Sequence, residues 1–377
     1  MSAASTCFAT CAPGLEGVLH AELKGLKIGL IERQVGGVRF QASPREVARV
    51  NIGLRTANRV LVRVARFDCP DEDALYAAAR EIPWETWLAP DGCVRVDAQV
   101  RDSRLDHSRY AEQRVKDAVV DRMMDLSGTR PSVGTIDEVD VGIHLHLHRN
   151  RATLALDSSG PPLYKRGWRT AQGRAPLTET LAAGLVLLSG WDRRAPLVDP
   201  FCGSGTILVE GGWIATNRAP NIERSFAFQR WADHDKRSLE RERQAARDAI
   251  TPRSKLRLWG GDWDTSRVME TEAHLEAAGL GQNADIHKAD AREFTPRDGW
   301  NANIVTNPPW GERVGSVDEL IGTYSAFGQR LREHGSGCHL TMLSSEPRLL
   351  DAIALPGPRT SLPNGATPCT VLRGEIE

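Results

Sequence analysis

The sequence lacks an excess of charge of either sign. Among 377 residues, 48 Lys and Arg stand against 49 Asp and Glu, which gives a net charge of -1. A chain-wide attraction to polyanions such as nucleic acids is therefore missing. Any such binding site has to be a local patch of basic residues.

Long hydrophobic runs are also missing. No apolar run approaches the roughly 20 residues that are needed to cross a bilayer. The longest, around residues 181–188, ends at Ser189-Gly190 and is typical of a core helix. The first residues do not combine a basic start with a hydrophobic segment, so we expect neither a membrane protein nor a secreted one.

The cysteines do not form a recognisable framework. There are 7, an odd number with irregular spacing, and the pair Cys7 and Cys11 has no second pair at zinc-finger distance. We therefore expect reduced thiols in a cytoplasmic protein, and no bound metal.

The composition, with 41% hydrophobic and 26% charged residues, is typical of a folded protein. The length exceeds that of one ordinary domain, so we expect more than one. Up to residue 159, helical and extended patterns are mixed, as in an α+β protein. Within this part, the pattern of residues 139–156 predicts a β-hairpin. Residues 160–174 are a linker rich in Pro, Gly and basic side chains. From residue 175, helices alternate with short strands, which predicts an α/β domain with an open, mostly parallel sheet.

The clearest local motif is the segment 199–206, Asp-Pro-Phe-Cys-Gly-Ser-Gly-Thr, between a predicted strand and a helix. Gly203 and Gly205 let a ligand approach the backbone, and the helix start presents free N–H groups. The third glycine of the dinucleotide fingerprint is absent, and no Gly-Lys-Ser/Thr completes a phosphate loop. Asp199 at the strand end suits a ligand with an ammonium group. Taken alone, the loop could equally be a tight turn.

Two further acids follow the next two predicted strands. Asp262 is placed to bind both hydroxyls of a ribose, and Asp290 to accept a hydrogen bond from an adenine amine. In a doubly wound sheet the carboxyl ends of the strands share one edge, where ligands bind. One such acid could merely cap a helix. Three at successive strands predict a nucleoside-like ligand.

The fourth strand of this series ends in Asn307-Pro308-Pro309-Trp310. The prolines fix the backbone and remove two N–H donors, which leaves carbonyl groups for the cleft. The Asn307 side chain and the Pro308 carbonyl could accept both hydrogens of a planar amine. Trp310 could stack on the ring that carries it. This pattern predicts a catalytic segment that binds an aromatic amine.

Together these motifs resemble the class I S-adenosylmethionine-dependent methyltransferases that act on amino groups. The resemblance is closer to the THUMP-containing RNA guanine-N2 methyltransferases, especially the bacterial 23S ribosomal RNA enzymes. It includes Phe8-Ala9-Thr10 near the start, 163–169 in the linker and 175–183 beyond it. Trp310 stands where many relatives have Tyr. The Trp ring keeps a face for stacking but has no phenol hydroxyl.

The resemblance implies a ferredoxin-like domain over 1–67, a THUMP RNA-binding domain over 68–159, the linker 160–174 and a Rossmann-like methyltransferase domain over 175–377. It implies S-adenosyl-L-methionine as cofactor, with Asp199, Gly203 and Gly205 at its methionine part, Asp262 at its ribose and Asp290 at its adenine. The expected cofactor-binding residues are Thr178, Asp199, Phe201, Cys202, Gly203, Gly205, Asp262, Trp263, Asp290, Ala291 and Asn307.

The expected RNA contacts lie in the basic linker, at Lys165, Arg166 and Arg169. A second candidate is the predicted strand with His144, His146 and His148 on one face, which could be a solvated face, an RNA-facing surface or, least favoured, a metal site.

The sequence therefore predicts a methyltransferase for the exocyclic N2 of a guanosine in structured RNA. We expect 23S ribosomal RNA as substrate and a monomeric enzyme. A transfer RNA guanosine is the alternative substrate. A DNA or protein-glutamine methyltransferase would share the Asn-Pro-Pro-aromatic motif. A non-catalytic RNA-binding or ribosome-assembly protein that retains the fold is the alternative from another class.

Overall fold

The computed structural model describes residues 4–134, 139–169, 177–253, 255–297, 299–311 and 315–377. The chain forms two compact units that interleave along the sequence. The first comprises residues 1–10, 22–165 and 221–245, and the second residues 11–21, 166–220 and 246–377. The chain passes between them within α1 (Glu16–Gly25) and near the end of α7 (Lys236–Asp248). Within the described residues, no helix is both long and apolar enough to cross a membrane.

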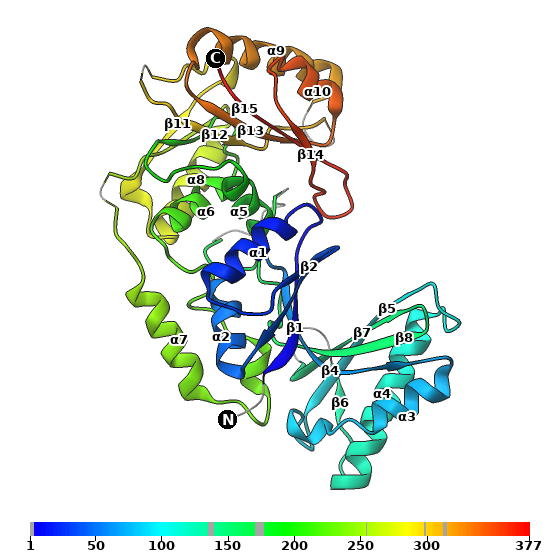
Figure 1. The fold of residues 1–377 in the computed structure, drawn as a ribbon. Helices are drawn as coiled ribbons and strands as arrows, with labels where there is room; N and C mark the ends of the chain where they lie inside the picture. Colours follow the sequence, from blue (N-terminus) through cyan, green and yellow to red (C-terminus); the bar gives the residue numbers. More distant parts are fainter. Residues whose placement is uncertain (1–3, 135–138, 170–176, 254, 298, 312–314) are drawn as a thin grey trace. The chain divides into compact units, whose positions relative to one another are not determined.

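An eight-stranded sheet organises the first unit (Figure 1), with strand order β2-β3-β1-β4-β8-β7-β5-β6. Most pairs are antiparallel, and β5 is parallel to both β6 and β7. The strands are β1 (Ser5–Thr10), β2 (Glu32–Gln34), β3 (Gly37–Ala42), β4 (Arg59–Asp68), β5 (Cys93–Arg101), β6 (Ser132–Val133), β7 (Val141–His148) and β8 (Arg151–Asp157). The helices that belong wholly to this unit are α2 (Pro44–Gly53), α3 (Glu72–Arg80) and α4 (Ser108–Ser127).

Alternating side chains give this sheet one apolar and one polar face. On β7, Ile143, Leu145 and Leu147 are buried, while the histidines between them are partly or fully exposed. The buried side chains join those of α3 and α4 in one core. The predicted hairpin is confirmed: β7 and β8 are antiparallel, and Arg149 and Asn150 adopt positive φ of 50° and 55° between them, as a tight hairpin turn requires.

Two features of the fold cross the domain boundaries predicted from the sequence, which stay predictions. The sheet continues across residue 67, because β4 pairs with β1 on one side and with β8 on the other. Residues 221–245, expected in the methyltransferase domain, group with the first unit. Asn221 Nδ2 donates to the Asn51 carbonyl at 2.9 Å, and the buried Glu242 carboxylate pairs with Arg45 and Arg49. Packing with α2 therefore decides where this segment belongs.

A seven-stranded sheet organises the second unit, with order β11-β10-β9-β12-β13-β15-β14. Its first five strands are parallel, and β14 and β15 complete it antiparallel. The strands are β9 (Leu197–Asp199), β10 (Leu258–Asp262), β11 (Ala284–Lys288), β12 (Asn303–Thr306), β13 (His339–Ser344), β14 (Arg359–Ser361) and β15 (Thr370–Glu375). The helices are α5 (Glu179–Leu188), α6 (Thr206–Ala215), α8 (Thr265–Ala277), α9 (Val317–His334) and α10 (Pro347–Ala352).

The order of these strands explains where ligand-binding residues can gather. β9 lies at the centre of the sheet. The next two strands in the sequence, β10 and β11, lie on one side of β9, and the strands from β12 onward lie on the other side. Loops that leave the carboxyl ends of the two halves therefore diverge and open a crevice. A core that includes Val198, Ile304 and Phe327 fixes the central strands. The predicted α/β arrangement with an open parallel sheet is confirmed.

Candidate functional site

The polar residues predicted at strand ends lie at one edge of the seven-stranded sheet. Asp199 ends β9 and Asp262 ends β10, while Asp290 follows β11 and Asn307 follows β12. These four strands are parallel neighbours. The topology therefore brings the four side chains to the carboxyl edge, as the sequence indicated.

Asp199 is the most buried of them, with 1% of its surface exposed. The Thr306 hydroxyl donates to its Oδ1 at 2.6 Å, and the Phe201 N–H donates to the same oxygen at 3.2 Å. Burial raises the pKa of Asp199 to about 7, and the nearby Asp262 carboxylate adds to the shift. A cationic group bound here would restore the ionised form.

The glycine loop is held by α8 from behind. Gly205 has φ of +75°, and a Cβ there would lie 2.8 Å from Cγ2 of Thr271. The Thr271 hydroxyl donates to the Gly203 carbonyl at 2.7 Å, and Nδ1 of His274 lies 2.9 Å from the Ser204 carbonyl. A Cβ at Gly203 would meet nothing closer than 4.0 Å. The loop is therefore packed on one side and open to a ligand at Gly203.

Thr271 and His274 were not identified from the sequence. Both have 0% exposure in an otherwise ordinary helix. Their spacing of three residues places them on one helical face, but polar residues at that spacing are common on solvated faces. Only the packing of α8 shows that they support the loop.

Asp262 connects β10 to the glycine loop. Its Oδ2 accepts the Gly203 N–H at 3.1 Å, and its Oδ1 accepts the Asp264 N–H at 2.9 Å. Burial raises its pKa above the usual carboxyl range, against the lowering effect of these bonds. The Cys202 N–H donates to the Gly261 carbonyl at 2.9 Å, so backbone and side-chain bonds both fix the distance from strand end to loop.

Asp290 is held in a different way. Arg292 donates to it from its backbone N–H at 2.9 Å and forms an ion pair with it at 2.5 Å. These bonds hold the pKa of Asp290 below its usual range. An ionised Asp290 can accept a hydrogen bond, although Arg292 competes for its oxygens.

The remaining predicted cofactor residues differ widely in exposure. Trp263 is 67% exposed and Ala291 is 6% exposed. Phe201 packs edge-on against Phe327, with ring centroids 5.3 Å apart. Thr178 is the N-cap residue that precedes α5, and its hydroxyl lies 3.3 Å from that of Thr180. Their contacts with a cofactor stay predictions.

The segment after β12 has one unpaired polar atom. Oδ1 of Asn307 is buried and has no hydrogen-bond partner among the described residues. The Tyr324 hydroxyl donates to the Pro309 carbonyl at 3.0 Å, and Trp310 Nε1 donates to the Leu343 carbonyl at 3.2 Å. The backbone is therefore fixed from two sides. A buried acceptor without a donor is costly, so Asn307 Oδ1 is a candidate acceptor for a donor group of a ligand.

The basic linker is more internal than expected. Arg166 pairs with Glu210 at 3.3 Å, and both side chains are fully buried. Arg169 pairs with Glu179 at 2.6 Å and donates to the Thr206 hydroxyl at 2.9 Å. The Arg166 side chain is too buried to contact RNA, contrary to the prediction, and Arg169 supports the start of α6. Lys165 is exposed and stays a predicted contact.

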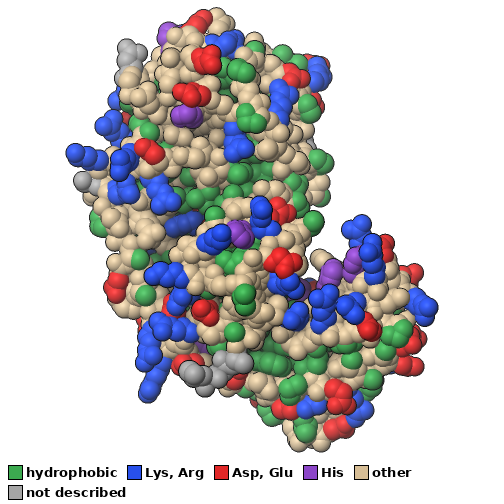
Figure 2. Space-filling view, in the orientation of Figure 1, with side chains coloured by type: hydrophobic (Ala, Val, Ile, Leu, Met, Phe, Trp, Pro, Cys, Tyr) green, Lys and Arg blue, Asp and Glu red, His purple; other side chains and the backbone are tan. Residues whose placement is uncertain are grey.

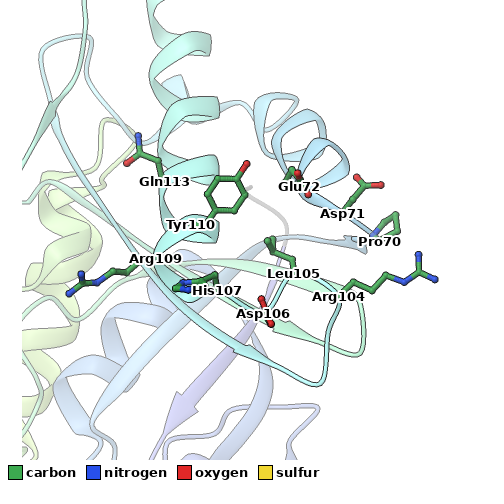
Figure 3. Close-up of a pocket in the computed structure, with 10 residues that line it drawn as sticks. All are labelled: Pro70, Asp71, Glu72, Arg104, Leu105, Asp106, His107, Arg109, Tyr110 and Gln113. Carbon is green, nitrogen blue, oxygen red and sulfur yellow. The ribbon is translucent and has the colours of Figure 1, made fainter.

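A hollow of about 850 Å³ lies in the first unit, at the start of α4 (Figure 3). Its lining mixes acids, such as Asp71 and Asp106, with Arg104 and Arg109, whose side chains extend away from each other. The hollow has charges of both signs and no converging polar groups, so we assign no ligand to it.

Comparisons with known domain families place three matches along the chain. Residues 166–369 match the RMKL-like methyltransferase domain, 6–61 the RlmL ferredoxin-like domain and 69–157 the THUMP domain. The ribosomal RNA large subunit methyltransferase K/L of Syntrophotalea carbinolica is 36% identical over 388 residues, covering 100% of this chain and 54% of that protein. The chain thus spans about half the length of the curated relatives it matches.

Solved structures agree over the whole chain. A possible methylase from Clostridium difficile 630 is 27% identical with a TM-score of 0.91, covering 99% of this chain and 98% of its own. SMU.472, described as a methyltransferase and solved in complex with SAH, is 26% identical with a TM-score of 0.90, covering 100% of this chain and 99% of its own. The predicted fold class is confirmed.

Proposed function

The chain belongs to the RMKL-like methyltransferase family, and from that premise we propose that it transfers a methyl group from S-adenosyl-L-methionine to the exocyclic N2 of a guanosine in 23S ribosomal RNA. The relatives named ribosomal RNA large subunit methyltransferase K/L support the substrate, and the SAH-bound neighbour supports the cofactor. The observation that carries the proposal is the unpaired Asn307 Oδ1 at the sheet edge that also holds Asp199 and Asp262.

The residues at this edge fit S-adenosyl-L-methionine. Asp199 would face the methionine ammonium group, and the open backbone at Gly203 would let that part approach closely. Asp262 would accept from the ribose hydroxyls, and Asp290 from the adenine amine. The glycine loop lacks the lysine that binds phosphates in a phosphate loop. It therefore suits a cationic ligand better than a diphosphate.

The chemistry assigned to the protein is positioning. When bound, the cofactor supplies a methyl group already activated by its positive sulfur. Asn307 Oδ1 and the Pro308 carbonyl would accept the two amine hydrogens of the guanine and turn the nitrogen lone pair toward that methyl group. Trp310 would stack on the base, a contact worth about 1–3 kcal/mol. The base has to leave its stack to reach this edge.

The activity is tested with the purified chain, radiolabelled S-adenosyl-L-methionine and 23S ribosomal RNA. Nucleoside mass spectrometry of the product should show N2-methylguanosine. Transfer RNA from the same cells serves as the competing substrate. Label in transfer RNA alone, or in neither RNA, would contradict the proposed substrate.

A further inference from the structure

The polar face of the eight-stranded sheet is formed by outward side chains of β3, β4, β5, β7 and β8, opposite the core with α3 and α4. Its basic members are Arg39, Arg63, Arg66, Arg95, Arg101, His144, His146, His148 and Arg151. Figure 2 shows Lys and Arg side chains gathered beside histidines over these strands. No role has been given to this face in the reaction.

An irregularity in β4 places two arginines on this face. The register with β8 shifts between Arg63 and Ala65, so Val64 is an extra residue in the strand. Arg63 lies opposite Ala155, and Arg66 lies opposite Thr153. In a regular strand, residues three apart point to opposite faces. The bulge brings Arg63 and Arg66 to the same face.

These two arginines differ from the other arginines of the face. Arg39 pairs with Glu32, Arg95 with Asp97, and Arg151 with Asp68. For Arg63 and Arg66, no ion pair is recorded with any residue that the structure describes. Arg63 donates to the Thr6 hydroxyl at 2.8 Å, which orients the side chain but leaves its charge uncompensated.

Further basic side chains lie beside this pair. Thr153 on β8 lies between Arg66 on β4 and His146 on β7 and is paired with both of them. The basic side chains around Arg63 and Arg66 therefore extend across three strands. Burial and the charges of Arg66 and Arg39 hold the pKa of Arg63 below its usual range. Burial, His148 and Arg66 do the same to the pKa of His146. Like charges held together in this way are relieved by an anion.

The surface is also hollowed at this point. An open depression of about 580 Å³ is lined by Arg63, Arg66 and Arg151 together with Thr6, Val64, Ala65, Phe67 and Asp68. Neighbouring strands lie about 4.8 Å apart, so cations on three strands can contact several phosphates at once. A single small anion would use only part of this surface.

The strands of this face carry no large exposed aromatic side chain among the described residues. The exposed aromatic side chains of the described chain are Tyr110 and Trp263, and neither lies on these strands. Phe67 is partly buried against the core. These strands therefore offer no exposed Trp, Tyr or Phe ring among the described residues for base stacking, whereas charge contacts with a backbone are available.

We propose that this polar face, centred on Arg63, Arg66 and His146, binds the sugar–phosphate backbone of folded RNA and reads shape rather than sequence. The proposal rests on the proposed function for the choice of RNA as the polyanion. It concerns affinity only, since the methyl-transfer residues lie on the other sheet.

The test compares full-length variants in binding to fluorescently labelled 23S ribosomal RNA transcripts. The double variant Arg63→Gln/Arg66→Gln should raise Kd at least about tenfold, and its salt dependence should have a slope lower by about two, since each phosphate contact contributes about 0.9 to the slope. The matched control, Arg237→Gln/Arg241→Gln on α7, removes the same charge from an exposed helix where acids and bases alternate. It should leave Kd and the slope unchanged.

Two further measurements separate the possible failures. Arg63→Lys/Arg66→Lys should retain binding within about threefold, because it keeps the charges. S-adenosyl-L-methionine affinity by calorimetry should be unchanged in every variant, which shows that the second unit is intact. Wild-type RNA affinity in the double Gln variant, or wild-type binding to phosphatidylserine vesicles in place of RNA, would overturn the inference. Loss of RNA binding in that variant, with no methyl transfer by wild type, would support the inference and contradict the proposed function.

Discussion

The two sheets of this chain place charge of opposite sign in different ways. The seven-stranded sheet collects Asp199, Asp262 and Asp290 at one edge, because its central strands are parallel and their carboxyl ends coincide. The eight-stranded sheet spreads arginines and histidines over one face, because its side chains alternate across the pleat. The near-zero net charge of the sequence hides this separation.

The comparison teaches that strand direction decides which kind of site a sheet can offer. Loops at a common edge can surround a small ligand, and the buried Asp199 carboxyl group shows that side chains at this edge are shielded from water. A flat face with one side in water cannot enclose a ligand, but it can contact an extended polyanion. If the assignments are correct, changes at the edge alter chemistry or cofactor affinity, and changes at the face alter RNA affinity.

The largest effect is expected from Asn307→Ala. Removing the unpaired acceptor should lower kcat about a hundredfold or more, in the range seen when one transition-state hydrogen-bonding group is lost. The Kd values for cofactor and RNA should stay within about twofold. Single-turnover methyl transfer, calorimetry and RNA titration measure the three quantities. An unchanged kcat would contradict the role of Asn307.

Asp262→Ala should act on cofactor binding. Losing hydrogen bonds to a charged group costs about 1.5–3 kcal/mol, which corresponds to a rise in Kd of about tenfold to a hundredfold. Calorimetry with S-adenosyl-L-homocysteine measures it. Asp262 also accepts the Gly203 N–H, so Asp262→Asn, which keeps an acceptor, is the control and should lose less affinity. Equal affinity in Asp262→Ala and wild type would contradict the placement.

The pH dependence of cofactor binding tests Asp199. Its pKa is raised to about 7 by burial, so the carboxyl group is neutral below that pH and ionised above it. A cationic ammonium group prefers the ionised form, and affinity should therefore fall about tenfold from about pH 8 to pH 6. In Asp199→Asn this dependence should disappear. A wild-type Kd that stays constant over this range would contradict the assignment.

The same raised pKa has a consequence for stability. The folded protein retains a proton on Asp199 at pH values where the unfolded chain has lost it, so this group makes the protein less stable as pH rises from about 4 to 7. Asp199→Asn should therefore raise the melting temperature of the ligand-free protein at pH 8 relative to wild type, while weakening cofactor binding. A melting temperature in the variant that is no higher than that of wild type would contradict this stability cost, because the Asn amide oxygen can still accept the Thr306 hydroxyl hydrogen bond.

The smallest effect is expected from Arg151→Gln. Arg151 lines the same depression as Arg66, but it is already paired with Asp68 at 2.9 Å and lies at the surface. Exposed pairs of this kind contribute about 0–1 kcal/mol. RNA affinity should change less than about threefold, well below the effect of the Arg63/Arg66 variant. A loss as large as that variant's would show that total charge, rather than uncompensated charge, decides binding.

For a physical reason, the sequence predicted where the edge residues lie better than it predicted the arrangement of the basic face. Acids at the ends of successive strands are visible as a pattern, since strand order and direction follow from the alternation of helices and strands. The glycine loop and the Asn-Pro-Pro-Trp segment are local for the same reason. Thr271 and His274 escaped notice because their function depends on how α8 packs against the loop.

The linker arginines show the opposite failure. Arg166 and Arg169 form the most basic stretch of the sequence, which suggested a surface for phosphates. Arg166 pairs with Glu210, and Arg169 pairs with Glu179. Both acids lie outside the linker, so the sequence alone does not show that they neutralise these arginines. Arg63 and Arg66 occur in an alternating strand and looked ordinary, because a bulge cannot be seen without the partner strand.

Val64 is one extra residue in β4 relative to the paired strand β8. Insertions and deletions at this point therefore change the pairing of the strand, which substitutions do not. Deleting that residue would restore strict alternation and leave the two arginines two positions apart, so both guanidinium groups would stay on the polar face. A strand that kept Val64 but paired it regularly with β8 would instead turn one guanidinium group toward the hydrophobic interior. The surface offered to a substrate therefore depends on how this strand is paired, which a comparison of composition alone would not detect.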